Sequence, residues 1–108
     1  MSGGKTVWNM AALDLRGVSV SKFSLSDVAS QNDSDLSKGY YFIRSSVDCS
    51  FKIDADPATT GLTFDNGITL AASRSPQGPF ELQEGDRFAA VTDAGFSGDF
   101  YFFKINGW

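Results

Sequence analysis

Apolar residues alternate with polar ones at a spacing of two along most of the chain, which is the periodicity of extended strands with two unlike faces. Between residues 49 and 53, Cys49, Phe51 and Ile53 fall on one face and polar residues on the other. The pattern predicts long strands over Val18–Leu25, Tyr40–Val47, Cys49–Ile53, Arg87–Thr92 and Phe100–Ile105, and shorter ones over Gly61–Phe64, Ile68–Ala71 and Phe80–Leu82.

Two of these strands depart from simple alternation. In the first, the apolar positions change phase between Val20 and Phe23, which predicts a β-bulge near Ser21. The last strand, Phe100–Ile105, is apolar on both faces at its centre, so we expect both of its faces to be covered.

Turn signals separate the strands at short intervals. Asn66-Gly67 is favoured where two turn residues need positive φ, and Gly85 and Gly98 can adopt left-handed conformations at little cost. Short strands with a turn about every eight to twelve residues are typical of β-sandwiches and small barrels. We predict an all-β fold, a single antiparallel β-sandwich of about seven or eight short strands.

Two regions lie outside the strand pattern. Ser26–Lys38 is polar and predicts a long loop, with at most one helical turn capped by Ser26. The first fifteen residues begin with a glycine-rich tip and then carry many apolar side chains, so we expect an N-terminal arm that docks on its own domain or on a neighbour. The predicted organisation is an arm over residues 1–15 and a β-sandwich domain over residues 16–108.

The amino-acid composition argues against most kinds of catalytic and metal site. The chain of 108 residues has no histidine and a single cysteine, which removes the commonest general base, the commonest metal ligand and any intrachain disulfide. Cys49 alternates with apolar residues and is interpreted as a small core residue rather than a reactive thiol. We therefore expect no enzyme activity, no catalytic residues, no metal and no cofactor.

The charge pattern limits the partners. The net charge is −4, and the nine basic residues are scattered singly, whereas nucleic-acid binding usually requires a basic face. Consecutive Tyr40, Tyr41 and Phe42 would send rings to both faces of a strand, which favours core packing over base stacking. No apolar stretch is long enough to cross a membrane, and the N-terminus lacks the apolar region of a secretory signal. We expect neither a nucleic-acid nor a membrane partner.

Carboxylates offer two weak candidates. Asp54-Ala55-Asp56 and Asp65-Asn66-Gly67 resemble fragments of a calcium loop, but Pro57 interrupts the ligand order, so turns capped by their own Asx side chains are the preferred interpretation. Glu81 and Glu84 flank a predicted turn and are candidates for the paired carboxylates of a glycosidase. Solvated turn residues are the preferred interpretation of this pair.

Large apolar residues at the margins of the domain are candidates for contact with a partner, because such side chains supply much contact area. For Trp8 and Trp108, docking onto their own domain is an equally open interpretation. The candidate interface residues are Val7, Trp8, Met10, Leu13, Phe80 and Trp108.

The central and C-terminal parts of the chain resemble a family of proteins. The run Tyr40–Ile53, the run from Ile68 through Phe80 to Val91, and the closing aromatic strand are similar to the strand-and-turn pattern of small virion proteins of tailed bacteriophages. The resemblance covers about Tyr40 to Ile105 and implies a compact β-sandwich.

The resemblance implies a structural role, and we expect a capsid decoration or cement protein that binds the assembled head lattice. Its partners would be the major capsid protein and copies of itself, with a trimer as the first expectation. It would be made in the host cytoplasm and located on the capsid surface. Two alternatives stay open: a glycan- or receptor-binding module of a tail fibre or spike, with Tyr40, Phe80, Phe96 or Tyr101 as a sugar platform, and a head-to-tail or collar component.

Overall fold

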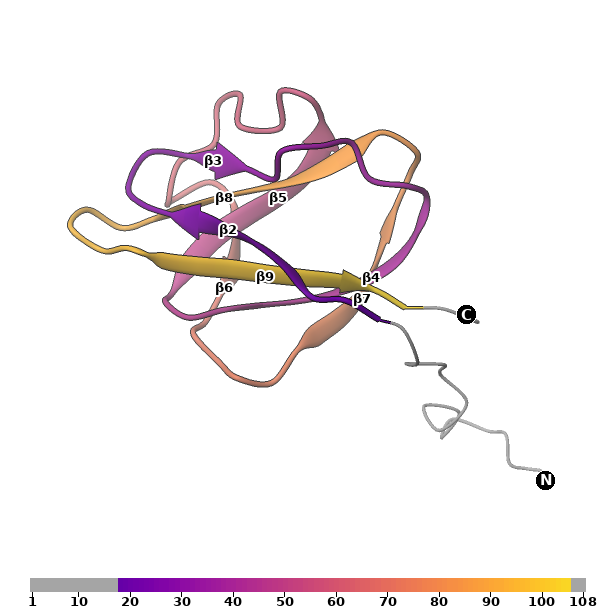
Figure 1. Ribbon diagram of the computed structural model, residues 1–108. Helices are drawn as coiled ribbons and strands as arrows, with labels where there is room; N and C mark the ends of the chain where they lie inside the picture. The colour runs from indigo at the N-terminus through magenta and orange to yellow at the C-terminus, as the bar shows by residue number, and fades with distance from the viewer. Residues whose placement is uncertain (1–17, 106–108) are drawn as a thin grey trace.

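The computed structural model describes residues 18–105, and this part of the chain is built from β-strands (Figure 1). The strands, in chain order, are β2 (Ser21–Leu25), β3 (Ser30–Gln31), β4 (Gly39–Ser45), β5 (Cys49–Ala55), β6 (Ile68–Leu70), β7 (Gln77–Leu82), β8 (Asp86–Thr92) and β9 (Gly98–Lys104).

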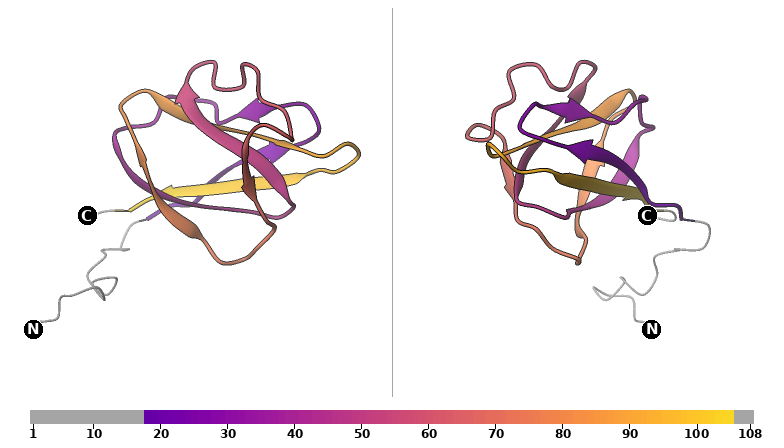
Figure 2. Two further views of the ribbon diagram at one scale, coloured as in Figure 1. Left: turned by 180° about the vertical axis from the view of Figure 1, so that it is seen from behind. Right: turned by 60° about the vertical axis from the view of Figure 1, so that its left-hand side comes forward.

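The strands form two antiparallel sheets of four strands each. One sheet has the order β2-β9-β4-β7 and the other the order β3-β8-β5-β6. The two layers face each other across the core, as the views from behind and from the side show (Figure 2). The predicted all-β fold, an antiparallel sandwich of seven or eight strands, is confirmed.

The pairing is nested along the chain. β5 pairs with β6, β4 with β7, β3 with β8 and β2 with β9, so that each step outward from the central hairpin adds one matched pair. The contacts of β4 with β9 and of β5 with β8 then join these pairs into two sheets. A long antiparallel ribbon wrapped in this way is the jelly roll, an architecture found in viral capsid and lectin domains.

Aromatic rings fill the space between the sheets. Phe88, from one sheet, lies 5.5 Å from both Phe100 and Phe102 of the other, measured between ring centroids. Phe51 contacts Phe100 at 6.1 Å. Because side chains alternate along a strand, the inner faces supply the whole cluster: Leu25, Tyr41, Ile43, Cys49, Phe51, Leu70, Leu82, Phe88, Ala90, Phe100 and Phe102.

The strand covered on both faces is β8, not β9. Phe88 and Ala90 face the main core, whereas Ala89 and Val91 pack beneath the loop between β5 and β6. In β9, Phe100 and Phe102 are buried but Tyr101 and Phe103 remain partly exposed on the outer face. The expectation that Phe100–Ile105 is covered on both sides is therefore wrong for these two rings.

Four local predictions are corrected. β2 pairs with β9 in unbroken register from Ser21 to Leu25, so the change of phase marks the start of the strand rather than a bulge. The polar segment 26–38 contains the short strand β3, which pairs with β8. Gly61–Phe64 forms turns instead of a strand. β7 begins earlier than predicted and includes Pro79, which is tolerated because β7 is an edge strand.

Two turn glycines are required for different reasons, one for its backbone conformation and one for close packing. Gly85, between β7 and β8, has a φ of 91°, as the sequence predicts. Neither Asn66 nor Gly67 has a positive φ, so the prediction of a turn of that type at this pair is wrong. Gly67 instead lies so close to β5 that a Cβ atom there would be 2.8 Å from the Cβ of Ser50.

The two ends of the described chain lie at the same end of one sheet. β2 and β9 are antiparallel neighbours, and Ser21 pairs with Phe102. Val18, just before β2, and Ile105, just after β9, therefore leave the domain side by side (Figure 1).

Candidate ligand-binding groove

The outer face of the β2-β9-β4-β7 sheet carries an unusual set of side chains. Phe100 and Phe102 of β9 and Tyr41 and Ile43 of β4 point into the core, so alternation sends the intervening residues outward. These outward residues are aromatic or charged instead of uniformly polar, namely Phe42 and Arg44 of β4, and Asp99, Tyr101 and Phe103 of β9.

One row of this face alternates cation, aromatic ring and cation. Lys22 of β2 stands opposite Tyr101 of β9, and Tyr101 stands opposite Arg44 of β4. The guanidinium carbon of Arg44 lies 3.8 Å from the centre of the Tyr101 ring. Stacking on the ring fixes the plane of the guanidinium and leaves its N–H edge available for an anion.

The next row is apolar. Phe42 of β4 pairs with Phe103 of β9, and their rings stack with centroids 5.7 Å apart and planes 12° apart. Val20, which precedes β2 and is 58% exposed, lines the same depression as Phe103. The row of Lys22, Tyr101 and Arg44 therefore lies next to a row of apolar side chains.

These side chains line two adjoining depressions. The first, of about 460 Å³, is lined by Val20, Lys22, Arg44, Pro76, Tyr101 and Phe103. The second, of about 640 Å³, shares Arg44 and Tyr101 with the first and adds Ser46, Ser73 and Arg74. Both volumes fall within the range of small-molecule sites. We refer to the two depressions together as the sheet groove.

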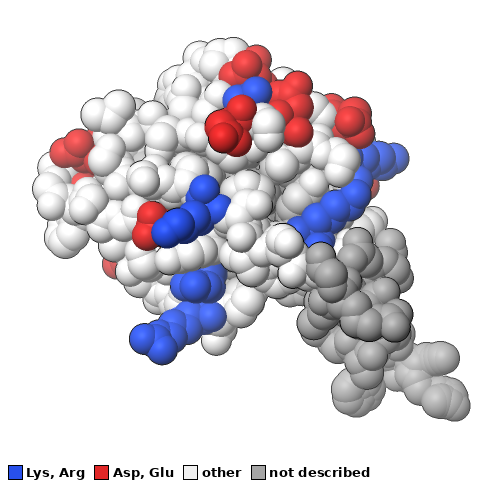
Figure 3. All heavy atoms as spheres, in the orientation of Figure 1, with Lys and Arg blue, Asp and Glu red and all other residues white. Residues whose placement is uncertain are grey.

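Charge is separated on the domain. Arg87 contacts Asp35 at 2.9 Å and Asp56 at 3.9 Å, and Lys52 contacts Asp54 at 3.7 Å, all around the β3-β8-β5 part of the other sheet. Within residues 18–105, Lys22, Arg44 and Arg74 form no ion pair with a carboxylate. Figure 3 shows most acidic side chains gathered at the top of the view and basic ones on its front, lower part and right-hand side, with one acidic side chain beside the basic ones on the front. The groove is a local basic patch on an acidic chain.

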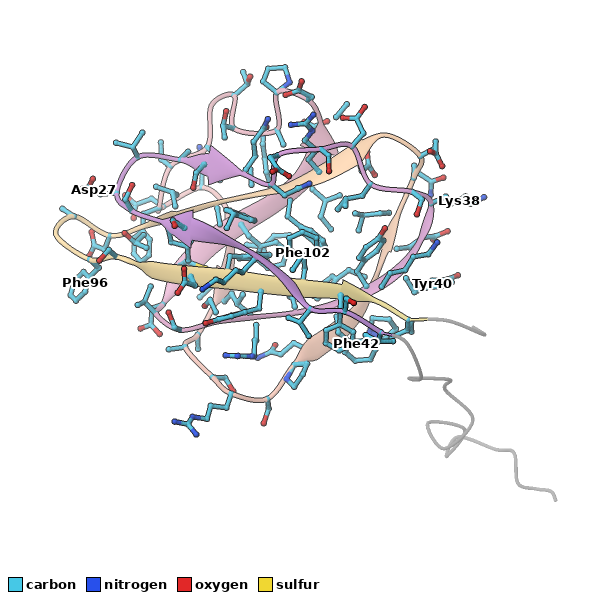
Figure 4. The ribbon with its side chains drawn as sticks, in the orientation of Figure 1. Asp27, Lys38, Tyr40, Phe42, Phe96 and Phe102 are labelled. Atoms are coloured by element: carbon cyan, nitrogen blue, oxygen red, sulfur yellow. The ribbon has the colours of Figure 1, made fainter. Side chains whose placement is uncertain are left out.

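The predicted sugar platform is not assembled as expected. Tyr101 lines the sheet groove, but Phe96 lies at the far tip of the β8–β9 turn, at the opposite end of the domain from Tyr40 (Figure 4). Phe80 points inward, where its ring meets that of Phe51 edge-on at 5.5 Å. Of the four aromatic residues, only Tyr101 is part of the groove.

Most predicted interface residues lie outside the described chain. Phe80 is half-buried and packs against the main core, so at least part of its apolar surface is used within the domain. The remaining candidates, which fall on residues that the structure does not describe, are Val7, Trp8, Met10, Leu13 and Trp108.

Cys49 belongs to the core. It is 1% exposed, and its thiol donates to the Oγ of Ser45 across 3.7 Å. Burial raises the pKa of the Cys49 thiol, and the charge of Asp48 acts in the same direction, while the contact with Ser45 opposes them. A protonated, inaccessible thiol is a packing residue, which confirms the interpretation made from the sequence.

Among residues 18–105, no three histidine, cysteine, aspartate or glutamate side chains are grouped so as to hold a metal ion. The same residues include no helix of the length and apolar character needed to span a bilayer. A third depression, near the β8–β9 turn, includes Asp48 and Asp93, whose carboxylates accept hydrogen bonds from the backbone N–H groups of Ala72 and Ala94.

Sequence reasoning missed the basic residues of the groove. Lys22, Arg44 and Arg74 are distant in the sequence and look like isolated surface charges. The only local signal was the outward position of Arg44 in a strand whose other outward residues are aromatic.

Comparison of the chain with protein-family profiles, with curated protein sequences and with solved structures gave no match.

Proposed function

We propose that this chain is a structural protein of a bacteriophage particle, a decoration or cement protein that binds the assembled head lattice and stabilises it. In this role its partners are the major capsid protein and other copies of itself, first of all in a trimer. It acts on the capsid surface after synthesis in the host cytoplasm, and it is neither an enzyme nor a partner of nucleic acid or membrane.

The observation that carries the proposal is the position of the apolar N-terminal sequence. Residues 1–17 include Val7, Trp8, Met10 and Leu13, and they join the domain at Val18, directly before the edge strand β2. Fully extended, seventeen residues reach at most about 60 Å, which is enough to cross to a neighbouring subunit. An apolar sequence attached at a sheet edge suits a contact between subunits.

The second edge of β2 offers a matching acceptor. Within the described chain β2 pairs with β9 alone, so no described strand pairs with this edge, although the carbonyl of Ser24 accepts a hydrogen bond from the Oγ of Ser30 at 2.8 Å. Proteins use such edges to add a strand from another chain. The jelly-roll topology also supports the proposal as an analogy of fold, since viral capsid domains share it.

Many weak contacts suffice for such a function. A lattice presents the same binding site many times, and a protein that bridges neighbouring subunits gains avidity from each additional contact. The acidic side of the domain would then face solvent and keep the particles dispersed.

A binding assay with particles tests the proposal. Purified full-length chain is mixed with phage heads that lack it, the heads are sedimented, and the bound copies are counted. We expect saturable binding with on the order of hundreds of copies per head, whereas a collar component would bind at about a dozen positions or fewer. Failure of the full-length chain to bind heads would overturn the proposal.

Shortened and substituted chains test the role of the N-terminal sequence. Deletion of residues 1–10 leaves every described strand in place, so the chain should fold yet lose binding. The double substitution Trp8→Ala and Met10→Ala should weaken binding in the same direction, while Lys5→Gln in the same sequence should not. Undiminished binding after the deletion would remove these residues from the mechanism.

The glycan-binding alternative is favoured by one specific observation, the sheet groove with its exposed aromatic and basic side chains. A tail-fibre module and a decoration protein could both carry such a site.

A further inference from the structure

Arg44 is a preorganised donor for which residues 18–105 supply no side-chain or backbone acceptor. Its guanidinium is held over Tyr101, and within residues 18–105 its side-chain N–H groups donate to no other residue. Lys22 and Arg74 likewise make no side-chain hydrogen bond or ion pair with the described residues. A stacked guanidinium presents a fork of donors that matches a carboxylate in a bidentate manner.

The apolar part of the groove suits a ring with polarised C–H groups. Tyr101, Phe103 and Pro76 line the wall beside Arg44. The face of an aromatic ring carries partial negative charge, so C–H groups with partial positive charge pack well against it. Sugar rings present such C–H groups on one face and hydroxyl groups around their edges.

The second depression supplies hydroxyl groups next to the cations. The Oγ atom of Ser46 accepts a hydrogen bond from the N–H of Asp99, and the Oγ atom of Ser73 accepts one from the N–H of Ser75. Each hydroxyl therefore retains its own hydrogen for donation to a ligand. Arg74 lines the same depression, so a ligand that spans both parts meets apolar, hydroxyl and cationic groups in turn.

From this combination we propose that the sheet groove binds an acidic saccharide, a glycan whose sugar residues carry carboxylate groups. One sugar ring packs on Tyr101 and Phe103, its carboxylate is held by Arg44 with Lys22 or Arg74, and its hydroxyls bond to Ser46 and Ser73. The inference goes beyond the proposed role in the virion and does not depend on it, because the site lies entirely within residues 18–105.

Two other classes of anionic ligand fit less well. Nucleic acids gain affinity by neutralising several phosphates, whereas the basic residues that residues 18–105 bring to the groove are only Lys22, Arg44 and Arg74, on a chain of net charge −4. An acidic peptide would use the cations but would leave the aromatic wall without a ring to contact.

Titration of the isotope-labelled full-length chain with defined oligomers tests the proposal. The probes are a short oligogalacturonate, its methyl ester, a neutral cello-oligosaccharide, oligoglutamate and oligothymidylate. We expect the oligogalacturonate to bind with a dissociation constant of about 1 mM or lower and to shift the amide signals of Arg44 and Tyr101. The methyl ester should bind at least about tenfold more weakly, because it lacks the charge that the guanidinium recognises.

Substitutions locate the site. Arg44→Gln should weaken binding of the oligogalacturonate about tenfold to a hundredfold, which is the cost of one or two charge-assisted hydrogen bonds. Arg44→Lys, which keeps the charge but loses the planar fork, should lose less. Arg74→Gln is an exposed change outside the strands and gives a second variant that does not threaten folding. Lys38→Gln and Phe96→Ala, at other places on the surface, are the matched controls and should bind normally (Figure 4).

Several results would overturn the proposal. Equal affinity for the ester and the acid would remove the carboxylate from recognition. Binding of oligoglutamate or oligothymidylate as tight as that of the oligogalacturonate would assign the face to a peptide or a nucleic acid instead. Absence of shifts with every probe, or equal losses in Lys38→Gln and Arg44→Gln, would also refute it, whatever the result with phage heads.

Discussion

The guanidinium of Arg44 lies 3.8 Å from the centre of the Tyr101 ring, across the β4–β9 pairing of the sheet. The contact joins neighbouring strands on their outer face, and it sets the orientation of the central cation of the sheet groove. A pair of this kind contributes modestly to stability when it is partly exposed.

The stability of this contact can be measured separately from any ligand. Arg44→Gln should lower the free energy of unfolding by about 0.5–1 kcal/mol, because the cation–ring attraction is lost while the strand pairing remains. Urea denaturation measures the change, and Lys38→Gln serves as the exposed-charge control with no expected change. In a double-mutant cycle with Tyr101→Leu, a coupling free energy of zero would show that the two side chains do not interact.

Phe100 is expected to be the most sensitive core position. It is fully buried and contacts the rings of Phe23, Phe51 and Phe88, so Phe100→Ala removes a ring from the centre of the sandwich. The expected loss is about 3–5 kcal/mol, a large part of the stability of a small domain. Phe96→Ala, at a ring that is 61% exposed, should change stability by less than about 0.5 kcal/mol. Similar losses in both variants would contradict the assignment of the core.

Asn32 is a buried polar residue that connects the 26–38 segment to β8. Its Oδ1 atom accepts a hydrogen bond from the N–H of Phe88 at 2.9 Å, and its amide nitrogen donates to the carbonyl of Ser34. Asn32→Ala should lower the free energy of unfolding by about 1–3 kcal/mol, because the buried N–H of Phe88 is left without that acceptor. Chemical denaturation is the measurement, and Gln83→Ala, an exposed amide, is the control expected to have no effect.

Cys49 makes stability depend on alkaline pH. Because burial raises the pKa of the Cys49 thiol, the folded state keeps its proton at pH values where the unfolded state loses it. This contribution is complete below the ordinary thiol pKa of about 8.5 and is lost as the pH rises through the folded pKa. The native chain should therefore lose more stability than Cys49→Ala between about pH 7.5 and about pH 9.5. Parallel losses in the two proteins would show that the thiol makes no contribution.

The sandwich could be predicted because its strands follow local rules. Cys49, Phe51 and their alternating neighbours carry the period of two, and Gly85 marks a turn that needs a positive φ. The hydrophobic pattern failed to predict a strand where pairing with another strand determines the local structure. β3 is a polar strand of two residues that exists because Ser30 and Gln31 pair with β8. No local hydrophobic periodicity predicts it.

The groove could not be predicted for a similar reason. Lys22 and Arg44 become neighbours of Tyr101 only through the registers of β2 with β9 and of β4 with β9. Alternation within β9 did place Tyr101 and Phe103 on one face, but it could not show that this face lacks a covering layer within the described chain. Because the three basic residues of the patch come from separate segments, the distribution of charge along the sequence does not predict it.

The adjacency of Val18 and Ile105 has a practical consequence. Since both ends of the described chain emerge at one pole, peptides fused directly before Val18 and directly after Ile105 would leave the domain next to each other, away from the tip that carries Phe96. The same geometry makes residues 18–105 a candidate for circular permutation, with a short linker joining Ile105 to Val18 and new ends opened in the β8–β9 turn.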